Sequence, residues 1–431
     1  MLVLLTLGLS CSQPEPTSFV LITIDTLRAD HLGAYGYFRP TSPTIDQLAK
    51  EGVVFENAIA PIATTLPSHT SLMTSTYPVR HGILSNLQFY DQPVVTTSEI
   101  RTVAQMLRAK GYATAAFTSS SPLCEISGIN AGFEVFHGPP PYEADQSRID
   151  VPAEITTDLV LGWLSQASHP FFLWVHLFDP HHPYKPPASF QSLFTTDTAL
   201  DGVLRERHVA PRFRPKAAKI INQYDGEIRY ADSQIARIFE ALKARDLYER
   251  SVVVFTADHG EGLYENGIIQ HGWIYNAQIR IPLIMRFPDG RRGRVTQIAS
   301  LIDVLPTLAE EAGLPLDTKY FDGVNLFREK REFALSQREH RKPAWVDLNL
   351  ALTSLDWKYQ LFEGGEDLLV DIRKDPHETR NVLDEYPMMA DRMRREIMAL
   401  VVENGARSPL VVRDSIPPIV IEQLRSLGYV D

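Results

Sequence analysis

The sequence has few cysteines, few long apolar runs and fewer basic than acidic residues. Only Cys11 and Cys124 occur among the 431 residues, which excludes a fold held by a disulfide framework. The formal net charge is −11, and phosphate backbones would repel such a chain, so nucleic acid is not expected as its partner. Two local basic stretches, Arg205–Lys219 and Arg291–Arg294, are interpreted as solvated loop faces.

No apolar run is long enough to span a bilayer, which takes about 20 residues. The N-terminal run MLVLLTLGLS is typical of the hydrophobic part of a secretion signal. It ends at Cys11 in Leu-Ser-Cys, which resembles a bacterial lipobox, although no Lys or Arg precedes the run and Gly8 replaces a larger residue. We expect residues 1–18 to be a signal and tether of an exported protein, periplasmic or held at the cell envelope by a lipidated Cys11. A plain signal peptide or a misplaced start codon is the alternative.

Short apolar runs alternate with helical patterns over residues 19–330. The runs are typical of parallel strands buried on both faces, and they cover residues 19–24 (FVLITI), 171–175 (FFLWV) and 252–255 (VVVF). Apolar spacing with Pro or Gly at the ends predicts helices between Ser42 and Gly52, over Thr102–Lys110 and over Tyr230–Lys243. The alternation predicts a doubly wound α/β sheet.

The pattern changes near residue 330. Residues 357–362 (WKYQLF) and 367–372 (DLLVDI) flank two glycines and predict a β-hairpin. A helix is predicted from about Tyr386 to Val402, then a proline-rich segment and a short helix near Ile421–Leu427. Residues 331–431 are therefore predicted to form a small α+β subdomain.

Acidic residues and histidines stand at the ends of all three predicted strands. In strand order they are Asp25, then His176, Asp179, His181 and His182, then Asp258 and His259. Any one of them alone would more often be a helix-capping aspartate or a core histidine. Functional groups collect at the carboxyl ends of strands in open α/β sheets, so the convergence of three strand ends points to a shared site.

Thr65 precedes a helix-forming segment. Pro67 suits a first helical turn, which would place Thr65 just outside the helix N-terminus, where the dipole and free N–H groups favour negative charge. A hydroxyl there is well placed to become an alkoxide and attack an anionic ester. The alternative is that Thr64 or Thr65 only caps the helix.

Motifs along most of the chain resemble those of the sulfatases, in the alkaline phosphatase superfamily. They are IDTLRADHLGAYGY, TSPTIDQLAKEGVVFENAIAP, TLPSHTSLMTSTYPVRHG, YDGEIRYADSQIARIF, TADHGEGLYENGIIQHG, RIPLIMRFP, DLLVDIRKDPHETRNV and EQLRSLGYV. The resemblance implies a large mixed, mostly parallel sheet sandwiched by helices, with a small C-terminal α+β subdomain.

The resemblance also implies roles for single residues. Asp25, Asp258 and His259 match positions that bind a divalent metal. Thr65 matches the nucleophile, whose oxygen would be a further ligand. His181 matches a histidine that contacts the transferred anion or the leaving group.

Further histidines are expected around Thr65. His182 competes with His181 for its assignment, and both His182 and His176 are expected to contact the substrate. His271 matches a histidine of phosphoethanolamine transferases, which also use a threonine nucleophile. His69 replaces the arginine of the family's Cys-x-Pro-Ser-Arg and is expected to orient or neutralise charge near Thr65.

The sequence departs from true sulfatases around the nucleophile. They carry Cys or Ser there, converted to formylglycine, and threonine is not a substrate for that conversion. Metal-activated threonine is the nucleophile of related phosphodiesterases and phosphotransferases. The second aspartate of the family's Asp-Asp pair is Thr26, and the expected Lys-Trp-His is replaced by residues 117–120 (FTSS). These departures favour phosphoryl chemistry.

The predicted ligands are two aspartates, one histidine and the Thr65 oxygen. This set is less oxygen-rich than a calcium site, so zinc or manganese fits better and calcium is the alternative. We expect one divalent ion, although Asp179, His182 and His271 could supply part of a second set.

We therefore predict a metal-dependent hydrolase that uses Thr65 to cleave phosphate mono- or diesters, or sulfate esters, of a small-molecule, glycan or lipid substrate. One alternative is a sulfatase acting on a sulfated glycan or aryl sulfate. Another is a transferase that moves a phospho-group onto an envelope lipid or glycan, although such proteins usually carry several N-terminal membrane helices that this sequence lacks. The third is an inactive binding protein, against which the intact set of Asp25, Thr65, Asp258 and His259 speaks.

Overall fold

The structure is a computed structural model that describes residues 17–87, 94, 100–141, 151–315, 317, 320–339, 349–362 and 365–406. Cys11, with nearly all of the predicted signal and tether, lies outside the described residues. The proline-rich segment and the helix predicted near residues 421–427 also lie outside them. Every helix in the described part of the chain is too short or too polar to cross a membrane.

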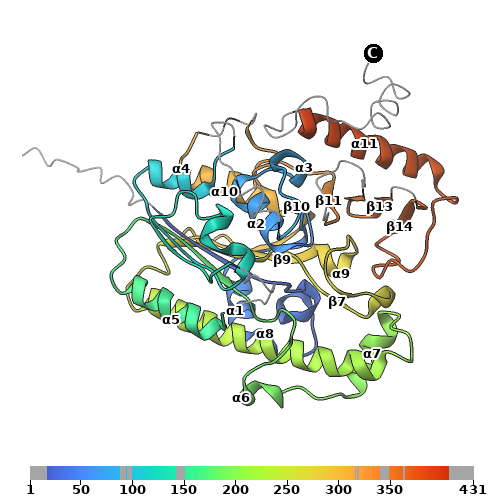
Figure 1. Cartoon of the computed structure of the whole chain (residues 1–431), viewed down its shortest axis with the longest axis horizontal. Coiled ribbons are helices and arrows are strands. Elements are labelled where there is room, and N and C mark those ends of the chain that lie inside the picture. Colours follow the sequence, from blue (N-terminus) through green and yellow to red (C-terminus); the bar gives the residue numbers. More distant parts are fainter. Residues whose placement is uncertain are drawn as a thin grey trace, which may run out of the picture.

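An eight-stranded sheet in the order β10-β2-β9-β6-β1-β5-β3-β4 forms the centre of the molecule (Figure 1). Its strands are β1 Ser18–Ile24, β2 Val53–Ile59, β3 Ala113–Phe117, β4 Val135–His137, β5 Phe171–Leu177, β6 Ser251–Ala257, β9 Arg280–Arg286 and β10 Gly293–Ser300. Only β9 runs antiparallel to its neighbours, β2 and β6, so the predicted mixed, mostly parallel sheet is confirmed.

The three strands predicted from apolar runs are neighbours in this sheet, in the order β6-β1-β5. Every residue of the three is buried, as expected for strands covered on both faces. Strand β5 is longer than predicted and runs on to Leu177, so His176 lies within the strand. The parallel pairing of β1 with β5 and β6 brings the carboxyl ends of these three strands to one edge of the sheet.

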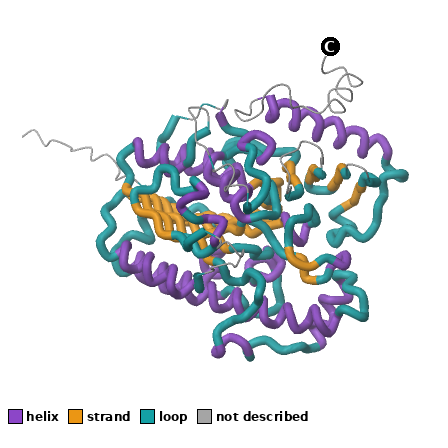
Figure 2. Tube along the Cα trace, in the orientation of Figure 1, coloured by secondary structure: helices purple, strands orange, loops and turns teal. Residues whose placement is uncertain are grey.

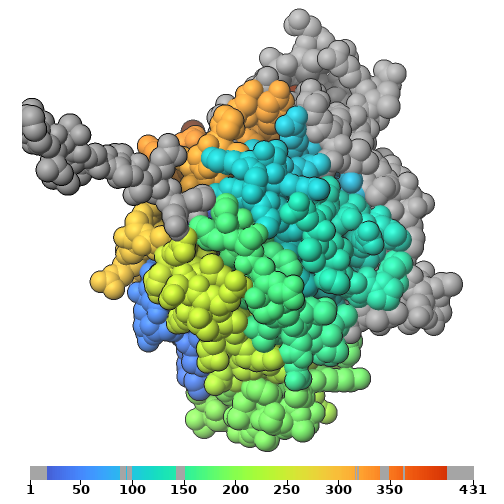
Figure 3. Space-filling model, turned by 90° about the vertical axis from the view of Figure 1, so that its left-hand side faces the viewer, coloured from blue at the N-terminus to red at the C-terminus, as the bar shows by residue number. Residues whose placement is uncertain are grey.

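Helices cover both faces of the sheet, as Figures 1 and 2 show. One layer contains α1 Pro43–Glu51, α5 Ala153–Leu164 and α8 Arg214–Lys243, and the other contains α2 Thr65–Thr74, α4 Val103–Ala109 and α10 Val304–Glu311. Helices α5 and α8 lie side by side on the face shown in Figure 3. Further helices in the described residues are α3 Pro78–His81, α6 Ala188–Gln191, α7 Thr198–Glu206 and α9 Asn276–Ile279. Single 3₁₀ turns are η1 Ala29–His31, η2 Gly33–Tyr35, η4 Ser121–Leu123, η5 Glu125–Ser127, η6 Glu265–Gly267 and η7 Leu301–Asp303.

Helix α8 is much longer than predicted, and the interpretation of Arg205–Lys219 as a solvated loop face was wrong. Its early turns bury Ala217 and Ile221 at helical spacing. The polar residues further along the helix obscured this apolar spacing in the sequence. Just before it, Arg207 is only 5% exposed and pairs with acidic side chains. The predicted helices α1 and α4 are confirmed within a residue of their expected ends.

A second, antiparallel sheet follows, in the order β11-β12-β13-β14. Its strands are β11 Ala334–Gln337, β12 Leu350–Thr353, β13 Trp357–Leu361 and β14 Leu368–Asp371. Helix α11, Pro387–Ala406, packs on it through Met393 and Ile397. The predicted hairpin and C-terminal helix are confirmed. A small hairpin of β7 Gly262–Leu263 and β8 Ile269–Gln270 stands beside the main sheet.

Candidate metal centre and active site

The carboxyl ends of β1, β5 and β6 bring four ionisable side chains together. Asp25 follows β1, His176 is the penultimate residue of β5, and Asp258 and His259 follow β6. All four are 0% exposed. Their convergence follows from the strand order, because β1 pairs with both β5 and β6.

The distances within this cluster suit a shared metal ion. His259 Nε2 lies 3.4 Å from Asp258 Oδ2 and 3.9 Å from Asp25 Oδ1. His176 Nε2 lies 3.7 Å from Asp25 Oδ2. Two atoms that each lie about 2.0–2.2 Å from one ion are expected at such separations. Asp25, Asp258 and His259 are close enough together to hold one ion.

Backbone contacts aim two of these ligands inward. The Nδ1–H of His259 donates to the Gly260 carbonyl at 2.9 Å, which leaves the Nε2 lone pair toward the carboxylates. Asp258 Oδ1 accepts from the backbone N–H of Thr26 and of His259 at 3.2 and 2.7 Å. Asp258 Oδ2 is buried without a hydrogen-bond partner among the described residues, as expected of an atom that a cation would satisfy.

Thr26, at the position of the family's second aspartate, lies in a sharp turn after β1. Its φ of +55° lies in the left-handed region, which costs about 1–3 kcal/mol for a residue other than glycine. Two hydrogen bonds hold it: the Tyr224 hydroxyl donates to its carbonyl at 2.7 Å, and its own N–H donates to Asp258. The turn therefore couples the Asp25 segment to Asp258.

The two carboxylates disfavour each other's charge. Burial raises the pKa of Asp258 well above its ordinary value, and the nearby Asp25 charge raises it further. A bound cation would reverse both effects, because its charge is the largest in such a site. The arrangement is therefore unfavourable for two bare anions and favourable for a metal ion.

Thr65 is the first residue of α2, and Thr64 holds the N-cap position. The prediction that Thr65 lies just outside the helix was wrong by one residue. Neither threonine hydroxyl caps the helix, and both are buried without a hydrogen-bond partner among the described residues. The Ser68 hydroxyl donates to the Asp258 carbonyl at 2.7 Å and so fixes the first turn of α2 against the aspartate. Thr65 thus carries an unsatisfied buried hydroxyl in the helical turn that Ser68 bonds to Asp258.

His69 joins Thr65 to the same cluster. Its Nδ1 lies 2.8 Å from the Thr65 carbonyl and 3.7 Å from Asp258 Oδ2. Burial lowers the pKa of His69 to about 4. The ring is therefore neutral near pH 7, so an orienting role fits and neutralisation by a cationic His69 does not.

His271 lies between His259 and His181. Its ring centroid lies 4.6 Å from that of His259 and 5.1 Å from that of His181. Burial lowers the pKa of His271, but the charges of Glu261, 3.3 Å from Nδ1, and of Asp25 and Glu339 together leave the pKa raised. The Tyr184 hydroxyl donates to the other Glu261 oxygen at 3.0 Å. Glu261 thus favours the protonated form of His271, which can give up a proton.

Glu261 and Tyr184 were missed by sequence reasoning. Each follows a predicted site histidine by two residues, His259 and His182 respectively. Their roles depend on the fold of the β7–β8 hairpin and of the segment after β5. The signal available was their place in the same two motifs.

His182 and Asp179 have contacts outside the cluster. His182 is exposed and its ring packs edge-on against Tyr184, so the structure favours His181, which is 3% exposed. Asp179 accepts a hydrogen bond from the Ala153 N–H at the start of α5. With His271 held by Glu261, the three residues considered for a second ion do not converge.

The loop that replaces the family's Lys-Trp-His element supports His176. The Ser119 hydroxyl donates to the His176 carbonyl at 2.8 Å, and the Ser119 N–H approaches His176 Nδ1 at 3.4 Å. His176 Nε2 therefore faces the site, where it is buried without a hydrogen-bond partner among the described residues. The neighbouring Ser120 hydroxyl is also buried without one.

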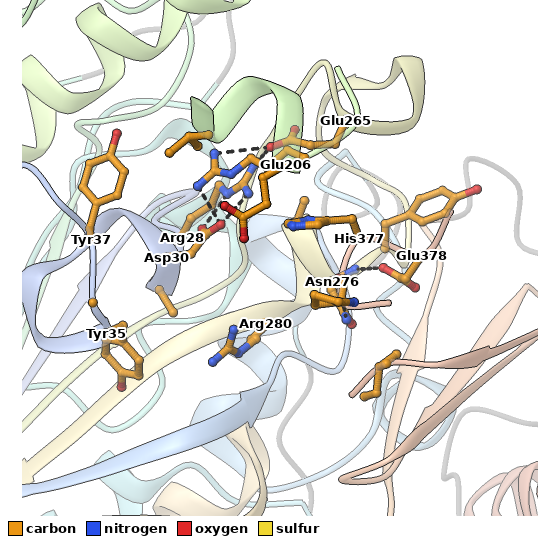
Figure 4. A pocket seen from close by; sticks show the side chains of 18 of the residues that line it. Arg28, Asp30, Tyr35, Tyr37, Glu206, Glu265, Asn276, Arg280, His377 and Glu378 are labelled. Atoms are coloured by element: carbon orange, nitrogen blue, oxygen red, sulfur yellow. Dashed lines mark hydrogen bonds and ion pairs between the residues drawn. The ribbon is translucent and has the colours of Figure 1, made fainter. Parts of the chain in front are cut away.

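A network of ion pairs lines a cavity of about 600 Å³ (Figure 4). Arg28 pairs with Glu265 at 2.7 Å and Asp30 at 2.8 Å, and Arg207 pairs with both acids from the other side. Arg28 also donates to the Glu261 carbonyl at 3.1 Å. We call the side chains of Arg28, Asp30, Arg207 and Glu265 the ion-pair wall. It supports the segment after β6 that carries His259.

A family model described as Sulfatase matches residues 17–314, more than half of the chain. The chain belongs to the sulfatase family. This confirms the family inferred from the motifs, and with it the family's place among the ester hydrolases of the alkaline phosphatase superfamily.

Relatives and solved structures agree with that family. The chain is 26% identical over 326 residues to the ulvan-active sulfatase of Formosa agariphila, a match that covers 69% of this chain and 62% of that protein. It is 26% identical over 376 residues to human arylsulfatase A, covering 75% and 69%. The chain thus spans less than two thirds of the first relative's length.

Two solved structures share the fold. The phosphonate monoester hydrolase of Agrobacterium radiobacter has a TM-score of 0.73 at 20% identity, covering 90% of this chain and 96% of its own. A sulfatase-like protein of Bacteroides fragilis has a TM-score of 0.79 at 20% identity, covering 92% and 97%. The fold class predicted from sequence is therefore confirmed.

Proposed function

We propose that this sulfatase-family protein is a metal-dependent phosphoesterase with Thr65 as its nucleophile. One observation carries the proposal. The Thr65 hydroxyl is fully buried yet unsatisfied, at the first residue of a helix whose first turn is bonded to Asp258. A buried hydroxyl without a partner costs about 1–3 kcal/mol. The Thr64 hydroxyl is also unsatisfied, but only Thr65 matches the nucleophile position of the family motif, and its carbonyl is held by His69.

Asp25, Asp258 and His259 would hold one divalent ion, with the Thr65 oxygen as a further ligand. We favour zinc or manganese over calcium, because the set combines an imidazole with few oxygens. When bound, such an ion lowers the pKa of a coordinated hydroxyl and neutralises charge on the ester.

The chain's own residues then account for two steps. In the first, the Thr65 proton leaves to solvent, its oxygen bonds to phosphorus, and the bond from phosphorus to the leaving alcohol breaks. His271 protonates the departing oxygen. In the second, water attacks phosphorus and gives a proton to His271, the bond from phosphorus to Thr65 breaks, and the Thr65 oxygen takes back a proton from solvent. His181 and His176 would contact the ester oxygens.

Threonine is the reason to prefer phosphate over sulfate. A sulfate on formylglycine can leave by collapse to an aldehyde, whereas an ester of Thr65 needs a second attack by water or an alcohol. The family's sulfate-neutralising lysine is also replaced by the serine loop beside His176. The sulfatase names of the relatives support the alternative, a sulfatase acting on a sulfated glycan or aryl sulfate.

The rest of the sequence prediction is kept as a proposal. We propose export to the periplasm or cell envelope, with a membrane tether through Cys11, and a small-molecule, glycan or lipid ester as substrate. An acceptor alcohol in place of water would make the protein a transferase.

The test compares substrates and nucleophile variants. Purified protein with zinc, manganese or calcium is assayed on p-nitrophenyl phosphate, bis(p-nitrophenyl) phosphate and p-nitrophenyl sulfate. Thr65→Ala should lower kcat by a factor on the order of 10³ or more, as loss of a nucleophile does. The matched control is Thr64→Ala, which removes the neighbouring buried hydroxyl and should retain activity.

Two results would overturn the proposal. Turnover by Thr65→Ala at the rate of the unmodified protein would remove Thr65 as the nucleophile. A preference for the sulfate ester by a factor of ten or more would transfer the assignment to a sulfatase.

A further inference from the structure

Three buried side chains form a hydrogen-bonded chain that ends on the backbone of Thr65. The Trp174 indole lies 3.0 Å from the Thr23 hydroxyl, and that hydroxyl lies 3.1 Å from His69 Nε2. His69 Nδ1 lies 2.8 Å from the Thr65 carbonyl. All four residues are 0% exposed. Strands β5 and β1 thereby reach α2 through a polar path inside the core.

The two ends of this chain fix the direction of its bonds. Tryptophan Nε1–H can only donate, so the Thr23 oxygen accepts from Trp174. The Thr65 carbonyl can only accept, so His69 Nδ1 carries a proton and donates to it. In the neutral ring Nε2 then carries the lone pair, and the Thr23 hydroxyl donates to it. The hydrogen-bonded chain thus favours one of the two His69 tautomers.

The opposite tautomer would be unfavourable on the Nδ1 side of the ring. An Nδ1 lone pair would face the Thr65 carbonyl oxygen at 2.8 Å. It would also lie 3.7 Å from Asp258 Oδ2, close enough for His69 to compete as a metal ligand in the group that it forms with His176 and Asp258. The selected tautomer points a proton in that direction and excludes His69 as a ligand through Nδ1.

We propose that Thr23 and Trp174 are positioning residues, which hold His69 in this tautomer from the Nε2 side and through it hold the backbone of Thr65. This inference rests on the proposed role of Thr65. It assigns to a neutral relay the place that a cationic arginine occupies in the family motif. Misplacing a reacting group by about 1 Å can cost 10²-fold in rate, which is why a fixed backbone at Thr65 matters.

The competing explanation is that the relay only satisfies buried polar atoms. Thr23→Val tests it, because valine keeps the shape of threonine and removes the hydroxyl. Thr23→Ser restores the hydroxyl and should restore function. The matched control is Thr256→Val on β6, since Thr256 is the register partner of Thr23, is 0% exposed and donates to the Pro282 carbonyl at 2.8 Å.

The experiment measures the tautomer directly and the kinetics beside it. In ¹⁵N-labelled, metal-loaded protein, His69 should show a protonated Nδ1 and a bare Nε2. Thr23→Val should lower kcat about 10- to 100-fold with KM changed less than about threefold, and should bring the second tautomer into the spectrum. Thr23→Ser and Thr256→Val should keep kcat within about threefold of the unmodified protein.

Several results would overturn the inference. A bare Nδ1 in the unmodified protein refutes the relay with no variant needed, and so covers the case in which Thr23→Val fails to fold. An unchanged kcat in Thr23→Val, or an equal loss in Thr256→Val, refutes the positioning role. Full activity in Thr65→Ala would instead refute the proposed function, and the tautomer spectrum would still decide the relay.

Discussion

The ion-pair wall and the cluster of Asp25, Asp258 and His259 are both buried groups of charged residues, yet they are built in opposite ways. In the wall, each carboxylate lies against an arginine. In the cluster, two carboxylates face each other, and Asp258 Oδ2 has no hydrogen-bond partner among the described residues. The charges of the wall are compensated within the protein, whereas those of the cluster would be compensated by a bound cation.

The largest expected effect is that substitutions in the two regions change the free energy of unfolding of the metal-free protein in opposite directions. Arg28→Met leaves Glu265 and Asp30 without one of their partners and should lower the free energy of unfolding by about 3–5 kcal/mol. Asp258→Asn removes one of two facing charges and should stabilise the metal-free protein at pH 7. Urea unfolding with a chelator present measures both.

The pH dependence of the Asp258→Asn effect follows from the raised pKa of Asp258. A carboxyl group with a folded pKa above its unfolded value contributes its stability below the unfolded pKa and loses it as pH rises through the folded one. The gain from Asp258→Asn should therefore vanish below about pH 4, the ordinary range of an aspartate. A gain that persists there would mean that charge repulsion is not its cause.

The next effect is stabilisation by metal. At 100 times its dissociation constant, zinc or manganese should raise the free energy of unfolding by about 2.7 kcal/mol through mass action. Asp258→Asn should lose most of this gain, and Arg28→Met should keep it despite its lower starting stability. Equal metal stabilisation in all three proteins would place the ion elsewhere.

A smaller effect concerns Glu261, which lies beside His271. Burial lowers the pKa of His271, and Glu261 contributes most to raising it again, so Glu261→Gln should lower it. If His271 protonates the leaving group, the high-pH limb of kcat/KM should move to lower pH. Tyr184→Phe keeps the carboxylate and is the control. An unmoved limb in Glu261→Gln would assign the acid to another residue.

The sequence was sufficient for the strands that carry the ligands, because fully buried parallel strands are continuous apolar runs. It was also sufficient to predict that Asp25, Asp258 and His259 lie together, because each stands at or just beyond the end of one of those runs. It was not sufficient for Glu261, Tyr184 or the relay through Thr23. Their partners lie 10 to 151 residues away along the chain, and a threonine inside a strand gives no local sign of what its hydroxyl contacts.

The same limit explains why the sequence leaves His181 and His182 as alternatives, between which burial favours His181. His181 is 3% exposed, stacks on Phe178 and touches the His271 ring, while His182 is exposed. His182→Ala should change kcat/KM by less than about twofold, because we propose that this exposed ring, packed on Tyr184, makes no contact with the transition state. His181→Ala should cost about 10²-fold or more, the range of a general acid or a transition-state donor. Equal losses in the two variants would mean that the segment after β5 rearranges when substrate binds, so that both histidines reach the ester.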